Sequence, residues 1–241
     1  NITKLYILSA VHGLILFLPI IVLFWQDNGL SLQQVFLLQG LFSLSLLTWE
    51  IPSGYLSDQW GRKRTIIAGS ILLLLGFLLY TFAGSFWEFA VAELFLSTGL
   101  SFHSGTIDAL AYDTLIALKE EKSYRRIVGH QYFVRFSAEA IGGIIGGLLA
   151  TVLHSFRAPV WATLLPFSIG LIVSIMLEEP KRHKLQETRH IHALWNICKQ
   201  TFAHNIALRS MILATGVIAA MSFAHFWLTQ PYQVDVEIPL I

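Results

Sequence analysis

Long apolar runs follow one another along the chain, and short polar connections separate them. The hydrocarbon core of a bilayer is ~30 Å thick, so a helix that crosses it needs about 20 residues. Windows of that length are apolar at seven places, which predicts seven membrane-spanning helices. No small-residue cleavage site follows the first run, so we interpret it as a retained span rather than a signal peptide. The expected spans are residues 5–25, 34–57, 65–83, 87–117, 127–153, 159–177 and 206–228.

The composition supports a membrane protein, because 55% of the 241 residues are hydrophobic and only 13% are charged. Soluble domains contain roughly 25% charged residues, and a chain with far fewer cannot cover a water-facing surface. The formal net charge of +1 gives no reason to expect nucleic acid as a partner, whereas the lipid bilayer is an expected partner. The single cysteine, Cys198, excludes an internal disulfide, and no metal-binding spacing occurs, so we expect neither a metal nor a cofactor.

Lysine and arginine gather in alternate connections, and such residues are retained on the cytoplasmic side of short loops. The basic connections follow the second, fourth and sixth spans, while the opposite connections hold only Arg157. With Lys4 on the basic side, we expect the amino terminus in the cytoplasm and an integral multi-pass protein, located in the inner membrane if the source is bacterial. The cations of the basic connections are Arg62, Lys63 and Arg64; Lys119, Lys122, Arg125 and Arg126; and Lys181, Arg182, Lys184, Arg189 and Lys199.

This topology predicts three parts of the chain. Residues 1–178 form a six-helix domain, residues 179–205 a cytoplasmic linker, and residues 206–241 a seventh helix with an extracytoplasmic segment. In the linker, apolar residues recur at helical spacing and predict an amphipathic helix. That helix either lies on the inner membrane surface or packs on the protein's own cytoplasmic face, and both interpretations stay open. Its apolar residues are Ile191, Leu194, Trp195, Cys198 and Phe202.

The connection between the second and third spans carries a dense motif, GYLSDQWGRKR, at residues 54–64. This run resembles the loop signature of the major facilitator superfamily, G-x-L-x-D-R/K-x-G-R-R/K, which also lies between the second and third spans. Six helices, a long cytoplasmic connection and a seventh helix resemble the amino-terminal half of such a transporter plus the first helix of its second half. The resemblance implies an all-α integral membrane fold, a helical bundle whose six-helix amino-terminal domain is a 3+3 inverted repeat.

The residue types of this motif also have physical reasons. Its two glycines allow close backbone approach and unusual dihedral angles, and its three cations anchor the inner side of the membrane. An acid beside three cations suggests an ion-pair latch, and the resemblance implies that the latch holds the inward gate shut between the two halves. We expect Asp113, near the inner end of the fourth span, to pair with Arg62. The alternative is an ordinary solvated loop whose charges only orient the chain. The candidate residues of the motif are Gly54, Asp58, Gly61, Arg62, Lys63 and Arg64.

Several ionisable residues lie inside the predicted spans, where each costs at least ~2.5 kcal/mol unless it finds a partner or a water-filled cavity. The helical rise places Glu50 and Arg135 at similar depth, with Glu139 one turn beyond, so we expect these three to form one buried network. Two interpretations stay open: the network fastens two helices, or an acid in it takes up and releases a proton during transport. The further candidates for buried charge or proton transfer are Asp108 and Glu93 on the fourth span and His12 on the first.

Small residues recur at four-residue steps on two spans, and such stripes allow close helix contact in lipid. The stripe on the fifth span is similar to the glycine-rich motif of the drug-exporter branch, although Gly143 stands where that motif has proline. The resemblance implies a sliding surface against the second half, and static helix packing is the alternative. The stripe residues are Ser97, Ser101 and Gly105 on the fourth span, and Gly142 and Gly146, flanked by Gly143 and Gly147, on the fifth.

These features predict secondary active transport of a small solute by alternating access, coupled to protons through an inner-half acid. We expect the cavity to be formed mainly by the first, fourth and seventh spans. A receptor or scaffold that keeps the fold but moves no solute is the alternative. We do not expect an enzyme: His103 and Asp108 fit an H-x4-D acyltransferase pattern, but on a continuous helix their side chains point apart. The expected partners are a small-molecule substrate and the carboxy-terminal half that the family resemblance implies.

Overall fold

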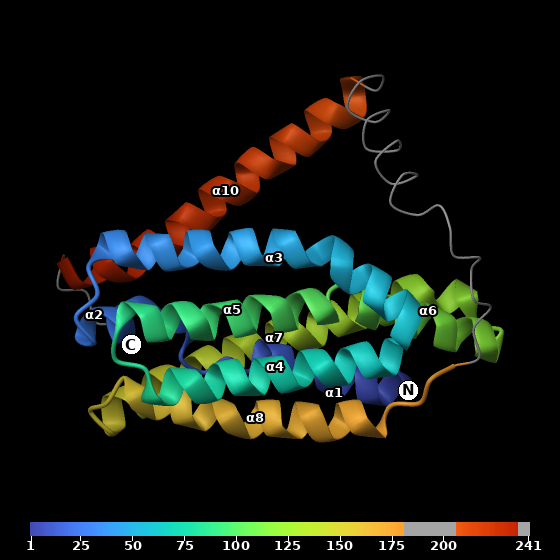
Figure 1. Cartoon of the computed structure of the whole chain (residues 1–241), viewed down its shortest axis with the longest axis horizontal. Helices are drawn as coiled ribbons and strands as arrows, with labels where there is room; N and C mark the ends of the chain where they lie inside the picture. Colours follow the sequence, from blue (N-terminus) through green and yellow to red (C-terminus); the bar gives the residue numbers. More distant parts are fainter. Residues whose placement is uncertain (181–205, 236–241) are drawn as a thin grey trace. The chain divides into compact units, whose positions relative to one another are not determined.

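Helices make up all the regular structure in the computed structural model, which describes residues 1–180 and 206–235 (Figure 1). The second, third, fifth, sixth and seventh predicted spans are confirmed as single helices. The amphipathic helix expected in the linker and the segment after residue 235 lie outside the described residues. The elements are α1 (Ile2–Gly13), η1 (Leu18–Ile20), α2 (Ile21–Asp27), α3 (Leu32–Trp60), α4 (Arg62–Phe82), α5 (Phe86–His103), α6 (Thr106–Leu118), η2 (Glu121–Ser123), α7 (Tyr124–Val152), α8 (Arg157–Met176) and α10 (Ile206–Asp235).

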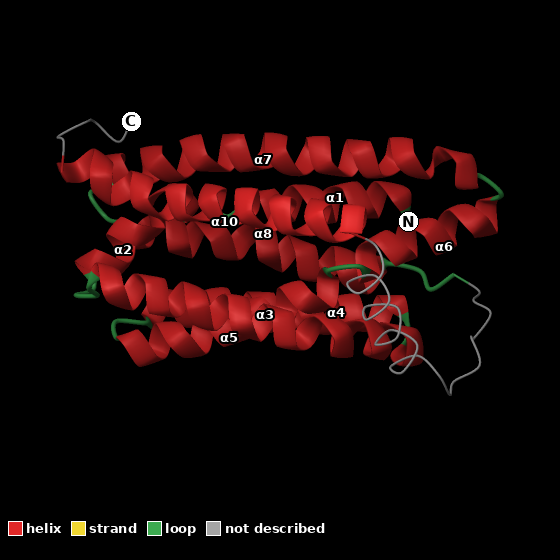
Figure 2. Cartoon of the chain, turned by 90° about the horizontal axis from the view of Figure 1, so that it is seen from above, coloured by secondary structure: helices red, strands yellow, loops and turns green. Residues whose placement is uncertain are grey.

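The helices up to α8 lie in one compact unit, and α10 belongs to a second unit. Within the first unit the packing repeats: α3 packs against α5 as α7 packs against α1, and α4 packs against α5 as α8 packs against α1. The helices α4 and α8 contact each other, and the long helices run alongside one another (Figure 2). Each of the first three spans therefore has neighbours equivalent to those of its counterpart among the second three, as an internal repeat requires. The predicted six-helix bundle is confirmed.

The six-helix unit buries several hydroxyl side chains within its apolar core and exposes many large apolar side chains, unlike a soluble protein. Ser97, Ser101 and Thr163 are fully buried, whereas Leu47 and Trp87 expose 72% and 76% of their surface. Among the described residues, five helical segments of this unit and one within α10 are long and apolar enough to cross a membrane. Large apolar side chains on the outside of a bundle are stable in lipid, and buried hydroxyl groups there need hydrogen-bond partners. Both features identify a membrane-embedded bundle.

The first predicted span is long and apolar enough to cross a membrane over Ile2–Asp27, but it is not the single continuous helix that was predicted. It divides into α1 and α2, which an irregular stretch and the short helix η1 connect. Pro19 in η1 has no backbone N–H to donate. In the irregular stretch before η1, the backbone N–H of Leu16 donates to Oγ1 of Thr163 on α8, at 3.1 Å. A hydroxyl from a neighbouring helix therefore satisfies a donor that the break sets free.

The fourth predicted span is also divided, so the prediction of a single helix over 87–117 is wrong. The helix α5 ends at His103, and α6 begins at Thr106. Between them Gly105 has φ 64° and ψ −35°, a conformation that residues with a side chain rarely adopt. Gly105 therefore terminates a helix rather than continuing the small-residue stripe of α5.

The turn between α3 and α4 depends on one of the two motif glycines. The helix α3 begins with a capping box of Ser31 and Gln34 and continues to Trp60. Gly61, with φ 114°, connects it directly to α4. Gly54 lies inside α3 without a positive φ, and no atom lies within 4 Å of the position that its Cβ would take. The expectation that Gly54 forms a turn or a close approach is therefore wrong for this structure.

The glycine stripe of α7 packs against the first span of the same unit. A Cβ on Gly146 would lie 1.6 Å from the carbonyl oxygen of Leu16, and a Cβ on Gly142 would lie 3.4 Å from that of Gly13. At Gly146 backbone meets backbone so closely that a side chain has no room, whereas a Cβ at Gly142 would make an ordinary contact. This contact supports the packing interpretation of the stripe, and its role as a sliding surface stays a prediction. Of the flanking glycines, Gly143 faces the ring of Pro19 and Gly147 is buried.

The serine stripe of α5 faces α3. The hydroxyl of Ser97 donates to Ser45 Oγ at 2.7 Å, and the hydroxyl of Ser101 lies 3.1 Å from the carbonyl oxygen of Leu46. Hydrogen bonds between helices add to close packing in a bilayer, where water exclusion contributes little. These serines therefore hold α5 to α3 and have no contact with the pocket described below.

Candidate functional site

The basic connections that the structure describes meet at one end of the six-helix unit, which we call the basic end. Lys4 Nζ, at the start of α1, lies 3.2 Å from Glu178 Oε1, just after α8. The side chain of Asn1 donates to Thr114 Oγ1 near the end of α6 at 3.1 Å. The start of α1 and the ends of α6 and α8 therefore lie together, as an orientation set by the cations requires. Which side of the membrane this end faces stays a prediction.

Arg62 links three helices at the basic end. Its Nη1 lies 2.7 Å from Asp58 Oδ1 on α3, and its Nε lies 3.4 Å from Asp113 Oδ2 on α6. The same Nη1 donates to Ser57 Oγ at 2.9 Å. The expected pair of Arg62 and Asp113 is present. All these residues belong to the six-helix unit, so the cluster ties α3, α4 and α6 together, and its role as a gate between two halves stays a prediction. Lys63 and Arg64 continue the basic turn into α4.

Glu179 adds an anchor that no sequence pattern indicated. Its two carboxylate oxygens accept hydrogen bonds from the backbone N–H groups of Arg62, at 3.0 Å, and Lys63, at 2.7 Å. These donors form the first turn of α4, where the helix dipole favours a negative charge. Because 116 residues separate Glu179 from Lys63, only the folded chain brings them together.

Arg157 joins three elements at the opposite end of the unit. Its guanidinium donates to Asn28 Oδ1 and to the carbonyl oxygens of Thr81, at 2.8 Å, and Ala83, at 2.9 Å. These carbonyl groups lie at the end of α4, where helical hydrogen bonds run out. The guanidinium also lies over the ring of Phe24 on α2, 5.5 Å from its centre. The isolated cation of the opposite connections is therefore a structural clamp.

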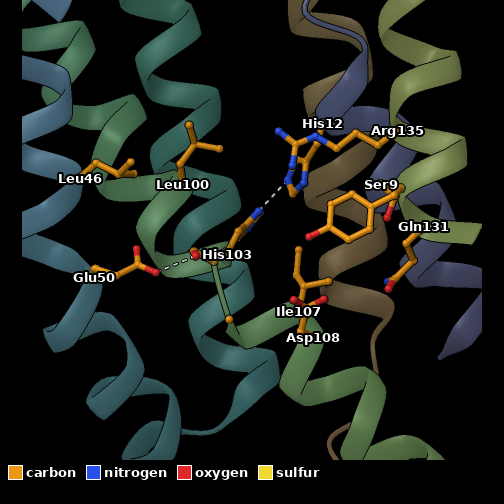
Figure 3. Close-up of a pocket in the computed structure, with 13 residues that line it drawn as sticks. Ser9, His12, Leu46, Glu50, Leu100, His103, Ile107, Asp108, Gln131 and Arg135 are labelled. Carbon is orange, nitrogen blue, oxygen red and sulfur yellow. Dashed lines mark hydrogen bonds between the residues drawn. The ribbon is translucent and has the colours of Figure 1, made fainter. Parts of the chain in front are cut away.

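A pocket of about 350 Å³ lies at the two helix breaks (Figure 3). The carboxyl ends of α1 and α5 and the amino end of α6 form part of its wall. Interrupted helices beside a cavity are typical of solute and ion sites in transporters. The first and fourth spans contribute as expected, and α3 and α7 contribute in addition, whereas α10 belongs to the other unit. The ionisable and amide side chains in the wall are His12, Glu50, His103, Asp108, Gln131, Tyr132 and Arg135.

Charged side chains enter the pocket from different walls. Glu50 comes from α3 and Arg135 from α7, and in Figure 3 they lie on opposite sides of the cavity. Glu50 Oε1 accepts a hydrogen bond from Ser104 Oγ at 2.8 Å. Among the described residues no ion pair joins Glu50 to Arg135, so the expected self-neutralised network is not formed. The pocket separates their helices, α3 and α7. Glu139 lies outside the pocket wall.

Two histidines form a hydrogen-bonded pair in the wall. His12 Nε2 lies 2.7 Å from His103 Nδ1, and His103 Nε2 lies 2.8 Å from the carbonyl oxygen of Ile66. A carbonyl oxygen only accepts, so His103 donates from Nε2 and accepts from His12 at Nδ1. The chain continues from His103 Nε2 to Ser70 Oγ, at 3.1 Å, and from there to Ser174 Oγ, at 2.7 Å. The pocket is thus connected to α8 through the core.

Sequence reasoning selected His12 and dismissed His103. The reason for dismissal, that His103 and Asp108 point apart on a continuous helix, is wrong because Gly105 breaks that helix and both side chains line the pocket. The hydrogen bonds of His103 nevertheless go to other residues and not to Asp108. Nowhere in the described residues do three or more His, Cys, Asp or Glu side chains cluster in a way that could hold a metal ion.

Gln131 on α7 is a buried amide that sequence reasoning missed. Its side chain lines the pocket, and only 6% of the residue is exposed. Within the described part of the chain neither its Oε1 nor its Nε2 has a hydrogen-bond partner. Buried polar groups are nearly always hydrogen-bonded, so such an amide needs an explanation. In the sequence it looks like any polar residue near a helix end.

Glu93 lies away from the pocket. Its carboxylate accepts a hydrogen bond from the hydroxyl of Tyr80 on α4. The ring of Tyr80 packs against Phe17 and Phe89, with ring centres 5.5 Å and 5.4 Å apart. The sequence offered no cation on the same helix, but the neighbouring helix offers a hydroxyl. A role for Glu93 in proton coupling stays a prediction.

Known proteins resemble the chain over most of its length. An uncharacterized MFS-type transporter of Methanocaldococcus jannaschii is 27% identical over 189 residues, which are 78% of this chain and 47% of the relative. A Na(+), Li(+), K(+)/H(+) antiporter of Planococcus maritimus is 22% identical over 213 residues, 84% of this chain and 49% of the relative. The class H tetracycline resistance protein of Pasteurella multocida is 26% identical over 168 residues, 69% of this chain and 40% of the relative.

The chain spans less than half the length of each of these relatives. The sequence profile of the Major Facilitator Superfamily matches residues 5–240. This match includes the basic turn, both broken spans and the pocket. The chain therefore belongs to the Major Facilitator Superfamily.

Proposed function

We propose that the protein moves a small solute across the membrane by alternating access, and that the pocket at the two helix breaks is its solute site. The observation that carries this proposal is an open pocket of about 350 Å³ in a lipid-embedded bundle, with the exposed residues Glu50 and Arg135 and the partly buried Asp108 in its wall. Ionisable side chains are tolerated at membrane depth where they find a partner or line a water-filled cavity. The transporter names of the relatives support the same activity.

Coupling to protons is the finer part of the proposal. Glu50 and Asp108 both line the pocket, and protonation of either acid changes the charge that a solute meets there. If the acid binds its proton with different affinity in the inward-open and outward-open states, solute movement is coupled to the proton gradient, since a ligand shifts an equilibrium only by its differential affinity for two states. The name of the Planococcus relative, an antiporter that exchanges cations for protons, supports this coupling.

The test uses the full-length protein in proteoliposomes that enclose a pH-sensitive dye. A thermal-shift screen first identifies solutes that raise the melting temperature of the protein. These solutes are added outside the proteoliposomes, and the entry of solute and protons is recorded. We expect at least one bound solute to enter and to change the internal pH, and Asp108→Asn to remove the pH change. Asp27→Asn, at the far end of α2 from the pocket, is the control and should behave as wild type. If bound solutes never enter, the transport proposal is wrong and the receptor or scaffold interpretation holds.

A further inference from the structure

We propose that the solute is a small zwitterion, with one carboxylate and one protonated amine, held between Arg135 on one wall of the pocket and Glu50 and Asp108 on the others. This inference rests on the proposed solute function of the pocket and adds the chemical class of the substrate. Amino acids are the simplest molecules of this class.

The wall presents both signs of charge, and the two signs come from different helices. Glu50 enters from α3 and Asp108 from α6, whereas Arg135 enters from α7 on the side opposite Glu50 (Figure 3). Among the described residues Arg135 has no ion-pair partner, and the bond recorded for Glu50 in the pocket is to a neutral hydroxyl, Ser104 Oγ. A ligand between these walls therefore meets a cation on one side and acids on the other.

Each alternative class of small solute leaves at least one charge of the pocket wall without a counter-ion or facing a like charge. A dicarboxylate is attracted to Arg135 but meets two acids, Glu50 and Asp108. An organic cation pairs with the acids but faces the guanidinium. A neutral sugar leaves all three charges without a counter-ion in a membrane interior, where unpaired charge is expensive. Only a molecule with both signs of charge pairs with both walls, and specificity follows from the mismatch that the other classes create.

Gln131 strengthens the carboxylate side of the site independently of charge. It is four residues before Arg135, so the two side chains lie on the same face of α7. Only 6% of the residue is exposed, its side chain lines the pocket, and its amide has no hydrogen-bond partner in the described part of the chain. The Nε2 group can donate to the carboxylate that Arg135 attracts. A ligand carboxylate would give the amide of Gln131 a hydrogen-bond partner and the guanidinium of Arg135 an ion-pair partner.

The size of the pocket limits the solute to a small molecule. Its volume of about 350 Å³ is at the lower end of the range for ligand sites, ~300–1,000 Å³. A free amino acid fits in such a space with some water, whereas a larger peptide does not.

The test measures binding to the full-length protein by calorimetry with matched probes. The zwitterions are glycine, L-alanine, L-leucine and L-glutamine, and each is compared with the amine that lacks the carboxylate and the acid that lacks the amine. We expect at least one zwitterion to bind at least about tenfold more tightly than both of its matched probes. If no zwitterion exceeds its matched probes, the inference is wrong. Entry of a sugar, dicarboxylate or organic cation in the proteoliposome assay also overturns it while leaving the transport proposal intact. A zwitterion that binds but never enters supports the ligand class and overturns transport.

Variants assign the two walls. Arg135→Gln should weaken zwitterion binding at least about tenfold and leave the matched amine unaffected, and Glu50→Gln should weaken zwitterion and amine alike. Arg135→Lys should restore part of the affinity, because it keeps the charge without the planar fork. The control is Arg126→Gln, an exposed cation on the same helix outside the pocket wall. Melting temperatures without ligand verify folding, and Glu50→Gln and Arg135→Lys keep the test valid if Arg135→Gln does not fold. Unchanged zwitterion affinity in Arg135→Gln contradicts the inference.

Discussion

Gly146 is the residue at which α7 and the unwound part of the first span come closest. Its missing side chain leaves room for the carbonyl oxygen of Leu16, which a Cβ would approach to 1.6 Å. That oxygen belongs to backbone whose N–H is bonded to Thr163, so it cannot move freely. We expect Gly146→Ala to destabilise the protein by about 1–3 kcal/mol, as overpacking does. A lower melting temperature in detergent checks this.

Gly129 on the same helix is the matched control for that change. No atom lies within 4 Å of the position of its Cβ. Gly129→Ala should be neutral or stabilise by up to about 1 kcal/mol, because alanine favours a helix over glycine. Equal melting temperatures for the two variants would show that the contact with Leu16 does not limit stability.

A substitution of Asp58 can separate a role in gating, measured as solute flux, from a role in folding, measured as the melting temperature. Its side chain is 57% exposed and pairs with Arg62 at 2.7 Å. An exposed ion pair contributes only about 0.2–1 kcal/mol, so Asp58→Asn should change the melting temperature little. If Asp58 holds the gate, the same change should lower solute flux in proteoliposomes at least about tenfold. Glu120→Gln, in the next basic connection, is the control. Flux equal to wild type in Asp58→Asn would remove this residue from the gate.

The sequence indicated some residues of the site and not others, and the reasons are physical. Asp58, Arg62 and Asp113 were found because a local motif and a matched depth bring them together. His103 was dismissed and Gln131 was missed, because their importance depends on contacts between helices that no local pattern carries. Depth along a helix can be counted from the sequence, but the direction of a side chain around the helix depends on where the helix breaks.

At the level of the helices, the pocket lies where α1 and α5 end, and the break at Gly105 forms part of its wall. Irregular backbone is tolerated at membrane depth where it is buried in protein or lines a cavity. A window of about 20 residues averages over a break of a few residues, so hydropathy alone reads each interrupted span as continuous. Gly105 looked like a member of a small-residue stripe, and its real role follows from a positive φ that is visible only in the fold.

Gly105→Ala tests this reading of the fourth span. The φ of 64° strains any residue with a Cβ even though the surrounding space is open, and such strain costs about 1–3 kcal/mol. We expect a lower melting temperature and weaker ligand binding, because the break positions His103 and Asp108. Gly40→Ala, inside α3 with open space around it, is the control and should retain both properties. A Gly105→Ala protein with the stability and ligand affinity of wild type would contradict the role of the break.

At the scale of the whole molecule, the basic connections alternate with connections that carry few cations, and the two sets of three spans pack in the same way. Both features follow from the same order of spans. The positions of the cations predicted which ends of the helices meet, and the contacts among Lys4, Arg62, Asp113 and Glu178 agree. The neighbour pattern of the six helices needed the folded chain, because sequence gives the order of the spans but not which pairs touch.

The tie between the first and last helices of the unit should depend on pH. The hydrogen bond from Lys4 lowers the pKa of Glu178, which lies after the end of α8. A lowered carboxyl pKa stabilises the folded state above the pKa of the unfolded chain, and this stabilisation is lost as the pH falls through the lowered value. Glu178→Gln should therefore melt slightly below wild type at neutral pH, and the difference should vanish in acid. Glu121→Gln should show no such difference, and a gap that persists in acid would rule out the ion pair as its cause.

Glu179 gives the segment that leaves α8 a mechanical role. Because its carboxylate is bonded to the first turn of α4, tension on that segment is delivered to the end of the basic turn and not to α8 alone. A load arriving there pulls directly on the residue that holds Asp58 and Asp113. A force applied at Glu179 is therefore shared between the end of α8 and the ion-pair cluster around Arg62.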